Sequence, residues 1–321
     1  MKFEYRNYEL SNAIIDIAAG PFGSNLKVSC FTETGFPIID GANLKGITVT
    51  DNITKFVSED KARSLHRSIA KRRDIVVTIS GNVGQISYIP DNSQYAEYLC
   101  SQRQFRVTFD ESKIYVPYLV YYLHSVEGQS KILAFANQTG VPALSQPLKN
   151  FRKIKMDLPS LKNQHKIADV LSTLDEKIAI NRAINDNLLE QMQAIYKSWF
   201  VDYLPFGGVM PESWTQTSIY SLANIIYGAP FASKQFNTEG NGKPIIRIRD
   251  LKDQQFATYT TEVHPKGYLL RPGDIVVGMD GEFRPYIWGN DEAWLNQRVC
   301  VFENKRPKGK AFLYFTIKPL L

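Results

Sequence analysis

The sequence contains few cysteines and no long apolar run. Its 321 residues include three cysteines, Cys30, Cys100 and Cys300, which lie far apart and form no CxxC pair. This spacing argues against a disulfide scaffold and against a zinc ribbon. No stretch approaches the roughly 18 consecutive apolar residues of a membrane helix, and the N-terminus MKFEYRNYELSN lacks the apolar core of a signal peptide. We therefore expect a cytoplasmic protein without a membrane partner.

Motifs for common catalytic chemistry are also missing. The segment GNGKP at 240–244 ends in proline where a P-loop needs Ser or Thr to hold magnesium. No GxGxxG follows a predicted strand, and no NPPF- or NPPY-type adenine-methyltransferase motif occurs. The four histidines form no HExxH, and we interpret them as surface or structural residues: His66, His124, His165 and His264. The sequence thus predicts no catalytic residue, no metal site and no cofactor in this chain.

One pattern leaves an enzymatic alternative open. Asp91 is followed by Glu111 and Lys113, and paired carboxylates with a lysine could bind Mg²⁺ and activate water. The spacing is loose, and we expect Glu111 in a loop before Pro117 instead of on a strand. A stand-alone Mg²⁺-dependent nuclease is therefore kept as an alternative hypothesis.

The composition is that of a globular protein with a mild excess of basic residues. Hydrophobic residues make up 44% and charged residues 22% of the chain, which excludes a disordered or low-complexity protein. Lys and Arg number 38 against 32 acidic residues, for a net charge of +6. This balance is compatible with a duplex-binding surface on part of the molecule.

An internal repeat organises the chain. GPFGS at 20–24 returns as APFAS at 229–233, and GFPIIDGANL at 35–44 returns as GKPIIRIRDL at 242–251. RRDIVVTISGN at 72–82, SQR at 101–103 and YLVYYL at 118–123 recur in the same order, at 271–282, 296–298 and 312–317. Five matches in one order predict a duplicated domain.

Each copy is predicted to be α+β. The runs 74–79 and 274–278 are short, β-branched and bounded by glycine, as buried strands are. Pro37 and Pro244 each precede two isoleucines and indicate strand starts, and Pro117 precedes a short helix with an aromatic face. We expect two similar mixed α/β domains joined by a long helix.

The segment between the copies predicts that helix. No Pro or Gly occurs from Leu161 to about Tyr203, after which Pro205, Gly207 and Gly208 end the run. About 40 residues at 1.5 Å each give a rod of about 60 Å.

Apolar residues along this helix follow a heptad pattern. Ten positions alternate in steps of four and three, as coiled-coil packing requires, and eight of them are apolar. We call these positions the seam: Ile167, Leu171, Leu174, Ile178, Asn181, Asn185, Leu188, Met192, Ile195 and Trp199. The two asparagines near the midpoint would fix register, because a slipped partner would leave them buried and unpaired. The alternative is a single amphipathic helix packed on its own domain.

The predicted boundaries are 1–156 for a first target-recognition domain, 157–208 for the spacer helix and linker, and 209–321 for a second recognition domain. The second copy stops at Leu321, so the equivalents of residues 128–200 are absent. We therefore expect the second domain to be incomplete at its C-terminal end.

The segment PSLKNQHKIADVLSTLDEKIAINRAINDNLLEQMQAIYKSWFVDY, set between two repeated domains, resembles the spacer of the DNA-specificity subunits of type I restriction–modification systems. The resemblance covers the whole chain and is most specific at 157–203. It implies a non-catalytic subunit whose two target-recognition domains each read one half of a bipartite site in double-stranded DNA. It also implies adenine-methyltransferase subunits docked on the helices, with S-adenosylmethionine bound by them, and a motor–nuclease restriction subunit for cleavage.

Polar loop residues near the repeated strands are the candidates for DNA contact. Lys and Arg neutralise phosphates, and Arg, Asn and Gln read base edges. In the first copy the candidates are Ser24, Asn25, Lys27, Asn43, Lys45, Asn82, Gln102 and Arg103, and in the second Ser233, Lys234, Arg247, Arg249, Lys252, Arg284, Asn296 and Arg298. For each of them an ordinary turn or solvated residue is the alternative. The basic segment at 61–73 is interpreted either as a phosphate-binding helix or as a solvated face.

Two further hypotheses concern assembly. Because the seam has no second helix of matching length in this sequence, we expect a homodimer through antiparallel helices spanning 161–203. An inactive remnant, or a recombination cassette that supplies recognition sequence to an intact gene, is the other alternative.

Overall fold

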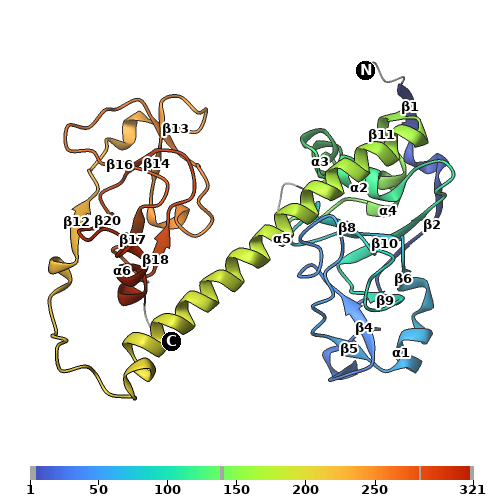
Figure 1. The fold of residues 1–321 in the computed structure, drawn as a ribbon. Coiled ribbons are helices and arrows are strands. Elements are labelled where there is room, and N and C mark those ends of the chain that lie inside the picture. Colours follow the sequence, from blue (N-terminus) through green and yellow to red (C-terminus); the bar gives the residue numbers. More distant parts are fainter. Residues whose placement is uncertain (1–4, 138–140, 282, 319–321) are drawn as a thin grey trace. The chain divides into compact units, whose positions relative to one another are not determined.

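The computed structural model describes residues 5–137, 141–281 and 283–318. The chain divides into two compact units, Met1–Asn181 (unit 1) and Arg182–Leu321 (unit 2). Both combine short helices with small sheets, so the predicted α+β class is confirmed (Figure 1). The division falls inside the long helix, which contributes its first half to unit 1 and its second half to unit 2. The three-part boundaries expected from the sequence stay a prediction.

Unit 1 contains three sheets and several short helices. A two-stranded sheet pairs β1 (Tyr5–Glu9) with β11 (Lys155–Pro159). The second sheet has the order β2-β10-β7-β8, with bounds Ile14–Ala19, Gln104–Phe109, Ile75–Thr78 and Ile86–Tyr88. The third has the order β3-β5-β4-β9-β6, with bounds Phe31–Thr32, Phe56–Val57, Phe36–Ile39, Glu97–Cys100 and Ile69–Lys71. The helices are α1 (Glu59–Ser64), α2 (Val116–His124), α3 (Val126–Leu133) and α4 (Pro147–Arg152).

The core of unit 1 forms where these elements meet. Strand β7 is buried along its whole length, which explains its continuous run of Ile and Val. On one side it packs with α2, where Leu119 and Leu123 are fully buried. Cys100 is also fully buried, and burial raises the pKa of its thiol to about 12, so this cysteine is chemically inert.

Unit 2 repeats the strand orders of unit 1. One sheet has the order β12-β20-β17-β18, with bounds Ala223–Tyr227, Val299–Asn304, Ile275–Gly278 and Pro285–Ile287. The other has the order β13-β15-β14-β19-β16, with bounds Phe236–Asn237, Tyr259–Thr260, Lys243–Ile246, Ala293–Leu295 and Leu269–Leu270. Helix α6 (Lys310–Ile317) completes it. The predicted duplication is thus confirmed at the level of topology.

The strand pairings also agree residue by residue. In unit 1 the parallel pair β4–β9 places Ile39 opposite Cys100, and in unit 2 the pair β14–β19 places Ile246 opposite Leu295. The predicted strands 74–79 and 274–278 are observed as β7 and β17, and Pro37 and Pro244 lie in β4 and β14. The predicted helix after Pro117 is α2.

The predicted long helix is α5 (Leu161–Phe200), 40 residues without a break (Figure 1). Its start is fixed in unit 1 by Gln164, which is fully buried. The Gln164 amide donates to Pro159 O over 2.9 Å and accepts from Tyr115 N over 2.8 Å. His165 stacks on the Tyr115 ring at 3.7 Å between centroids. These bonds replace the side-chain capping box, which position 163 cannot complete because it is Asn.

The helix ends three residues earlier than predicted. Tyr203 adopts a left-handed backbone with φ of 53°, and Gly207 and Gly208 have φ values of 75° and 80°. Such values end a helix, and glycine adopts them more readily than any other residue. Phe200 stacks on Trp214 at 5.6 Å in unit 2, which holds the chain after the helix against its last turn.

The seam is exposed over most of its length. Leu174, Ile178, Leu188 and Ile195 are 48–59% exposed. The first positions differ from the prediction, because Ile167 packs against the core of unit 1 and Leu171 is half-buried. In unit 2, the seam residues Met192 and Ile195 line an apolar groove of about 200 Å³ together with Tyr196, Phe200 and the α6 residues Ala311, Phe312 and Phe315. Both ends of the helix therefore pack on their own unit, and the middle of the seam faces solvent.

Among the described residues, no helix is both long and apolar enough to cross a membrane.

Candidate nucleic-acid interface

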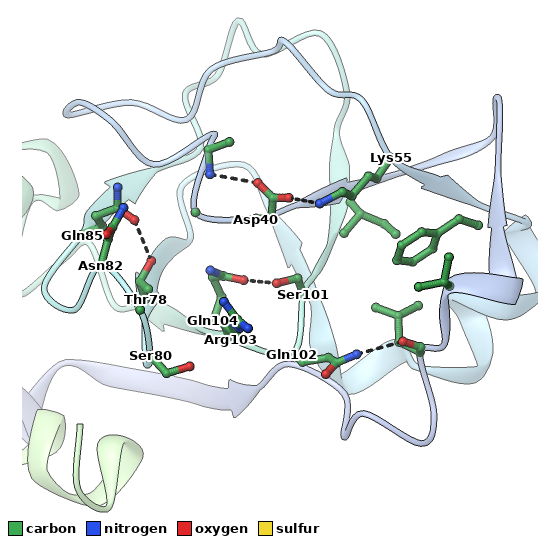
Figure 2. A pocket seen from close by; sticks show the side chains of 17 residues that line it. Asp40, Lys55, Thr78, Ser80, Asn82, Gln85, Ser101, Gln102, Arg103 and Gln104 are labelled. Atoms are coloured by element: carbon green, nitrogen blue, oxygen red, sulfur yellow. Dashed lines mark hydrogen bonds and ion pairs between the residues drawn. The ribbon is translucent and has the colours of Figure 1, made fainter. Parts of the chain in front are cut away.

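A polar cleft of about 650 Å³ opens at one edge of unit 1 (Figure 2). Three connections between strands are among the segments that line it. The first follows β4 and carries Asp40 and Gly41, the second joins β9 to β10 and carries residues 101–103, and the third joins β7 to β8 over residues 79–85. These connections meet because β4 pairs with β9, and β10 pairs with β7. We call this surface the unit 1 cleft.

A glycine lets the second connection approach strand β2. A β-carbon on Gly20 would lie 1.8 Å from the carbonyl oxygen of Ser101, a distance that no side chain tolerates. The equivalent Gly228 in unit 2 would meet Asn296 O at 2.0 Å. The glycine directly after β2 in unit 1 and after β12 in unit 2 is therefore structural, because it allows the base of the cleft to close.

Hydrogen bonds order the polar side chains inside the cleft (Figure 2). Lys55 Nζ lies 2.5 Å from Asp40 Oδ2. Thr78 Oγ1 donates to Gln85 Oε1 over 3.3 Å, and Ser101 Oγ donates to Gln104 Oε1. Gln102 Nε2 donates to Leu26 O over 2.9 Å. The cleft thus offers amides, hydroxyls and both charges within one surface, which is the set of groups that reads base edges and phosphates.

The structure places part of the predicted set in this cleft. Asn82, Gln102 and Arg103 line it and are exposed. Ser24, Asn25, Lys27 and Lys45 are exposed near residues that line it but do not themselves do so. The sequence reading missed Asp40, Lys55, Thr78, Gln85 and Gln104, whose only signal was their position beside the repeated strands.

Asn43 does not fit its predicted role. It is 5% exposed, its Oδ1 accepts from Asp40 N over 3.1 Å, and its Nδ2 donates to Asn52 O over 3.1 Å. The side chain is therefore used to shape the turn after β4. Asp250 does the same in unit 2, where its carboxylate accepts from Arg247 N over 3.0 Å.

The strand pairings define which residues of unit 2 are equivalent to those of the cleft. Gln104 pairs with Thr78, and Val299 pairs with Gly278. Ile38 N bonds Lys55 O, and Ile245 N bonds Thr258 O. The equivalent pairs are Asp40 and Arg247, Gly41 and Ile248, Lys55 and Thr258, Thr78 and Gly278, Ser80 and Asp280, Gln85 and Arg284, Ser101 and Asn296, Gln102 and Gln297, Arg103 and Arg298, and Gln104 and Val299.

The backbone scaffold is shared, but the side chains on it are not. Where unit 1 has the ion pair of Asp40 with Lys55, unit 2 has Arg247 donating to Thr258 Oγ1. Arg103 and Arg298 are identical, exposed and equivalently placed, and Arg298 pairs with Asp280. Of the other predicted residues in unit 2, Ser233, Lys234, Arg249, Lys252 and Arg284 are exposed, and Asn296 is half-buried.

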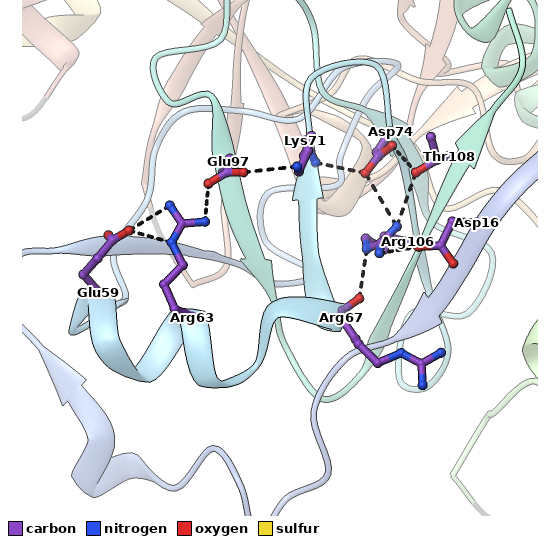
Figure 3. Close-up of polar contacts among 9 residues, drawn as sticks. All are labelled: Asp16, Glu59, Arg63, Arg67, Lys71, Asp74, Glu97, Arg106 and Thr108. Atoms are coloured by element: carbon purple, nitrogen blue, oxygen red, sulfur yellow. Dashed lines mark hydrogen bonds and ion pairs between the residues drawn. The ribbon is translucent and has the colours of Figure 1, made fainter.

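The basic segment 61–73 is not one phosphate-binding helix. It spans the end of α1, the 3-10 turn His66–Ser68 and strand β6. Figure 3 shows Arg63 of α1 held between Glu59 and Glu97, at 2.8 and 2.6 Å. The helical interpretation of the whole segment is therefore wrong.

Beneath this segment lies a buried charged network (Figure 3). Arg106 is 8% and Asp74 3% exposed. The Arg106 guanidinium bonds Asp16 Oδ2 at 2.6 Å and lies 4.0 Å from Asp74 Oδ2, while Thr108 Oγ1 donates to Asp74 Oδ1 over 2.6 Å. Burial raises the pKa of the Asp74 carboxyl, whereas the hydrogen bond from Arg106 lowers that of Asp16. Unit 2 has Val301 where unit 1 has Arg106.

We expect Arg106→Val to destabilise unit 1 by about 3 kcal/mol at pH 7, because it leaves Asp74 buried without its cation. This loss of stability becomes smaller as pH falls. A buried carboxyl with a raised folded-state pKa, such as Asp74, disfavours folding only while it is charged. The bond that lowers the pKa of Asp16 stabilises unit 1 fully above the ordinary pKa of a carboxyl, and this stabilisation is lost as pH falls through the lowered pKa. Far-UV circular dichroism in urea measures the change.

The chain supplies its own controls for this experiment. All four tryptophans, Trp199, Trp214, Trp288 and Trp294, lie in unit 2, so tryptophan fluorescence reports a transition that Arg106→Val leaves in place. Arg63→Ala removes an exposed arginine and is expected to change little. Adding Asp74→Asn to Arg106→Val should recover part of the loss, and no recovery would contradict the proposed cause.

The three residues of the nuclease hypothesis are engaged elsewhere. Arg73 bonds Glu111 through two nitrogens, at 2.8 and 2.7 Å, and lies 3.5 Å from Asp91. Lys113 pairs with Asp110 at 3.1 Å. A guanidinium thus occupies the space between the two carboxylates where Mg²⁺ would have to bind. In the part of the chain that the structure describes, no cluster of His, Cys, Asp and Glu is arranged to hold a metal ion.

Comparison with known proteins identifies relatives of this chain. Over 107 residues it is 43% identical to the type I restriction enzyme EcoBI specificity subunit of Escherichia coli, covering 33% of this chain and 23% of the relative. Over 205 residues it is 28% identical to the MjaVIII specificity subunit of Methanocaldococcus jannaschii, covering 56% of this chain and 47% of the relative. The matches thus span less than half the length of these relatives, and the expected truncation of the second domain stays a prediction.

The fold has a counterpart among solved structures. A type I restriction–modification S subunit from M. genitalium matches with a TM-score of 0.55 and 16% identity, over 98% of this chain and 77% of that one. The family model described as "Type I restriction modification DNA specificity domain" matches residues 23–190 and 211–321. These two stretches contain most of both units and most of the long helix, so the chain belongs to the type I restriction–modification DNA specificity family.

Proposed function

We propose that this chain is the DNA sequence-recognition subunit of a type I restriction–modification complex and is not itself catalytic. Unit 1 reads one half of a bipartite target in double-stranded DNA and unit 2 reads the other half. The observation that carries this proposal is the repeated scaffold with different side chains at equivalent positions. Two copies of one binding surface that differ in their polar groups fit two half-sites of different sequence.

The shared positions fit the sequence-independent part of binding. Arg103 and Arg298 occupy the same place in both units, as expected of residues that contact phosphates. Phosphate contacts position a protein on DNA and make its affinity salt-dependent. The chain's net charge of +6 is consistent with this role.

The long helix supports a role in assembly. About 60 Å of continuous helix exceeds the 34–36 Å of one turn of B-DNA, so a helix of this length is long enough to link the readers of two half-sites that are separated by an unread gap. Adenine-methyltransferase subunits dock along this spacer, and they bind S-adenosylmethionine. A motor–nuclease restriction subunit joins the complex for cleavage.

A second copy of this chain is the proposed occupant of the exposed seam. In an antiparallel pair centred on residue 183, Asn181 of one copy lies opposite Asn185 of the other, and Ile178 lies opposite Leu188. Each asparagine amide then meets an amide at the twofold axis, while any shift of register sets it against apolar side chains. The exposed middle of the seam, from Leu174 to Leu188, is where this pairing would occur.

Transfer of labelled methyl groups from S-adenosylmethionine to DNA tests this function. The chain and the methyltransferase subunit from its own locus are each assayed alone and then mixed. We expect incorporation only in the mixture, because recognition and methyl transfer reside on different chains. Methylation or Mg²⁺-dependent cleavage by this chain alone would contradict the proposal, as would specific methylation by the methyltransferase without it.

A further inference from the structure

Two glutamine side chains converge over Gly41 in the unit 1 cleft. A β-carbon placed on Gly41 would lie 3.1 Å from Gln85 Oε1 and 3.8 Å from Gln104 Nε2. The two glutamines come from different elements, since Gln85 ends the connection before β8 and Gln104 is the first residue of β10. The absence of a side chain at residue 41 therefore leaves room for both amide groups to face one point of the cleft (Figure 2).

Each amide is held at one end and open at the other. Thr78 Oγ1 bonds Gln85 Oε1, and Ser101 Oγ bonds Gln104 Oε1. Within the described residues, neither amide nitrogen has a hydrogen-bond partner. Gln104 is 1% exposed, so its rotamer is fixed before any ligand arrives. Gln104 Nε2 is thus an unused donor, and Gln85 Oε1 can accept a second bond beside the one from Thr78. Together the two atoms make a prepared site for a planar polar partner.

Unit 2 has a different surface at the equivalent positions. Ile248 replaces Gly41, Val299 replaces Gln104 and Arg284 replaces Gln85. A β-carbon on Gly278, the equivalent of Thr78, would lie 3.2 Å from Ile248 Cγ2. Unit 1 therefore has its glycine in the connection after β4 and a threonine in β7, whereas unit 2 has isoleucine in the connection and glycine in the strand. The isoleucine side chain fills the space where the amides lie in unit 1. Since the scaffold does not require the amides, they serve something particular to unit 1.

The donor and acceptor atoms of these amides indicate which base pair they would bind. Gln104 Nε2 and Gln85 Oε1 present one donor and one acceptor above Gly41, and these match N7 and N6 of adenine in the major groove. Resting on the proposed DNA-recognition function, we infer that Gln104, supported by Gln85, determines specificity for an A·T base pair in the half-site that unit 1 reads. Unit 2 reads its half-site without an amide at these positions.

Selection from a randomised duplex library tests this inference. The probe is the library itself, bound by the complete chain mixed with the methyltransferase subunit of its locus. Gln104→Val is the main variant, because Val299 occupies the same strand position in unit 2 and shows that the fold accepts valine there. Gln85→Ala is the second variant, and the half-site of unit 2 is the internal control in each case.

We expect Gln104→Val to abolish the preference for adenine at one position of one half-site. The loss of discrimination should be roughly fivefold to 150-fold, the range for one bidentate pair. Gln85→Ala should weaken the preference at the same position. Gln104→Glu should shift it toward cytosine, because a carboxylate accepts from cytosine N4 but cannot donate to adenine N7.

Each outcome separates this inference from the function on which it rests. An unchanged motif with Gln104→Val would overturn the inference and leave the DNA-recognition function standing. A loss at a position that is not adenine would also overturn it. Failure of the unmodified complex to select any motif would remove the proposed function, and this inference with it.

Discussion

A chain in which Leu174, Ile178, Leu188 and Met192 are all replaced by serine is expected to be a monomer where the unmodified chain is a dimer. These four side chains are 42–51% exposed, and pairing of two helices would bury eight of them. Burying a large apolar side chain contributes about 1.5–3 kcal/mol. If each of the eight side chains contributes only half of the lower value, their loss removes roughly 6 kcal/mol of dimerisation free energy. This corresponds to a dimer that is about 10⁴-fold weaker. Sedimentation velocity measures the change.

The helix offers a matched control. Thr173, Glu176, Asn187 and Glu190 lie on the same helix, away from the seam, and all are exposed. Replacing them with serine makes the same number of changes and lowers helix propensity in a similar way, but should leave the dimer intact. A native mass that is the same before and after the seam substitution would contradict the proposed homodimer.

Removing Arg103 and Arg298 together is expected to weaken binding to every DNA sequence without changing the preferred motif. Hydrogen bonds to charged groups contribute about 1.5–3 kcal/mol each, so we expect a loss on the order of 100-fold or more for the pair. The slope of log affinity against log salt should fall by about 2, roughly 0.9 for each lost phosphate contact. Fluorescence anisotropy at several salt concentrations measures both quantities.

Lys153→Ala with Lys266→Ala is the control for this pair. It removes the same charge from two exposed positions, one in each unit, neither of which is an equivalent position of the cleft. A loss of affinity as large as that of the arginine variant would mean that net charge, and not the placement of Arg103 and Arg298, determines binding. A changed motif in the arginine variant would show that these residues read bases.

The internal repeat in the sequence allowed much of the fold to be predicted. Matching segments around Ile38 and Ile245 located β4 and β14, and the long run without Pro or Gly located α5 to within three residues. These signals are local, since a buried strand and a long amphipathic helix each have a period that a single sequence displays. The contacts at the ends of the helix were not predictable in the same way. Ile167 satisfies the heptad and still packs on the core of its own unit.

The cleft was only partly predictable, because it depends on strand pairing. Gln85 and Gln104 are 19 residues apart, and only the pairing of β7 with both β8 and β10 brings their amides together. Asn43 and Asn82 are the same residue type in similar loops, yet the first shapes a turn and the second lines the cleft. Comparing the two copies position by position supplies the missing signal, since equivalent residues that differ mark the places where the units have different partners.

The central claim, that two units of one chain read the two halves of a DNA target, is tested most directly by selection from a randomised duplex library. The chain is mixed with the methyltransferase subunit of its locus, and the bound duplexes are sequenced. We predict enrichment of a bipartite motif with an unread gap. Different half-sites are the expected result, since unit 1 and unit 2 of one chain then both read DNA. Identical half-sites would contradict the claim, because two copies would then read through unit 1 alone. A complex that forms but enriches no motif would contradict the account, and failure to form a complex would favour the inactive remnant.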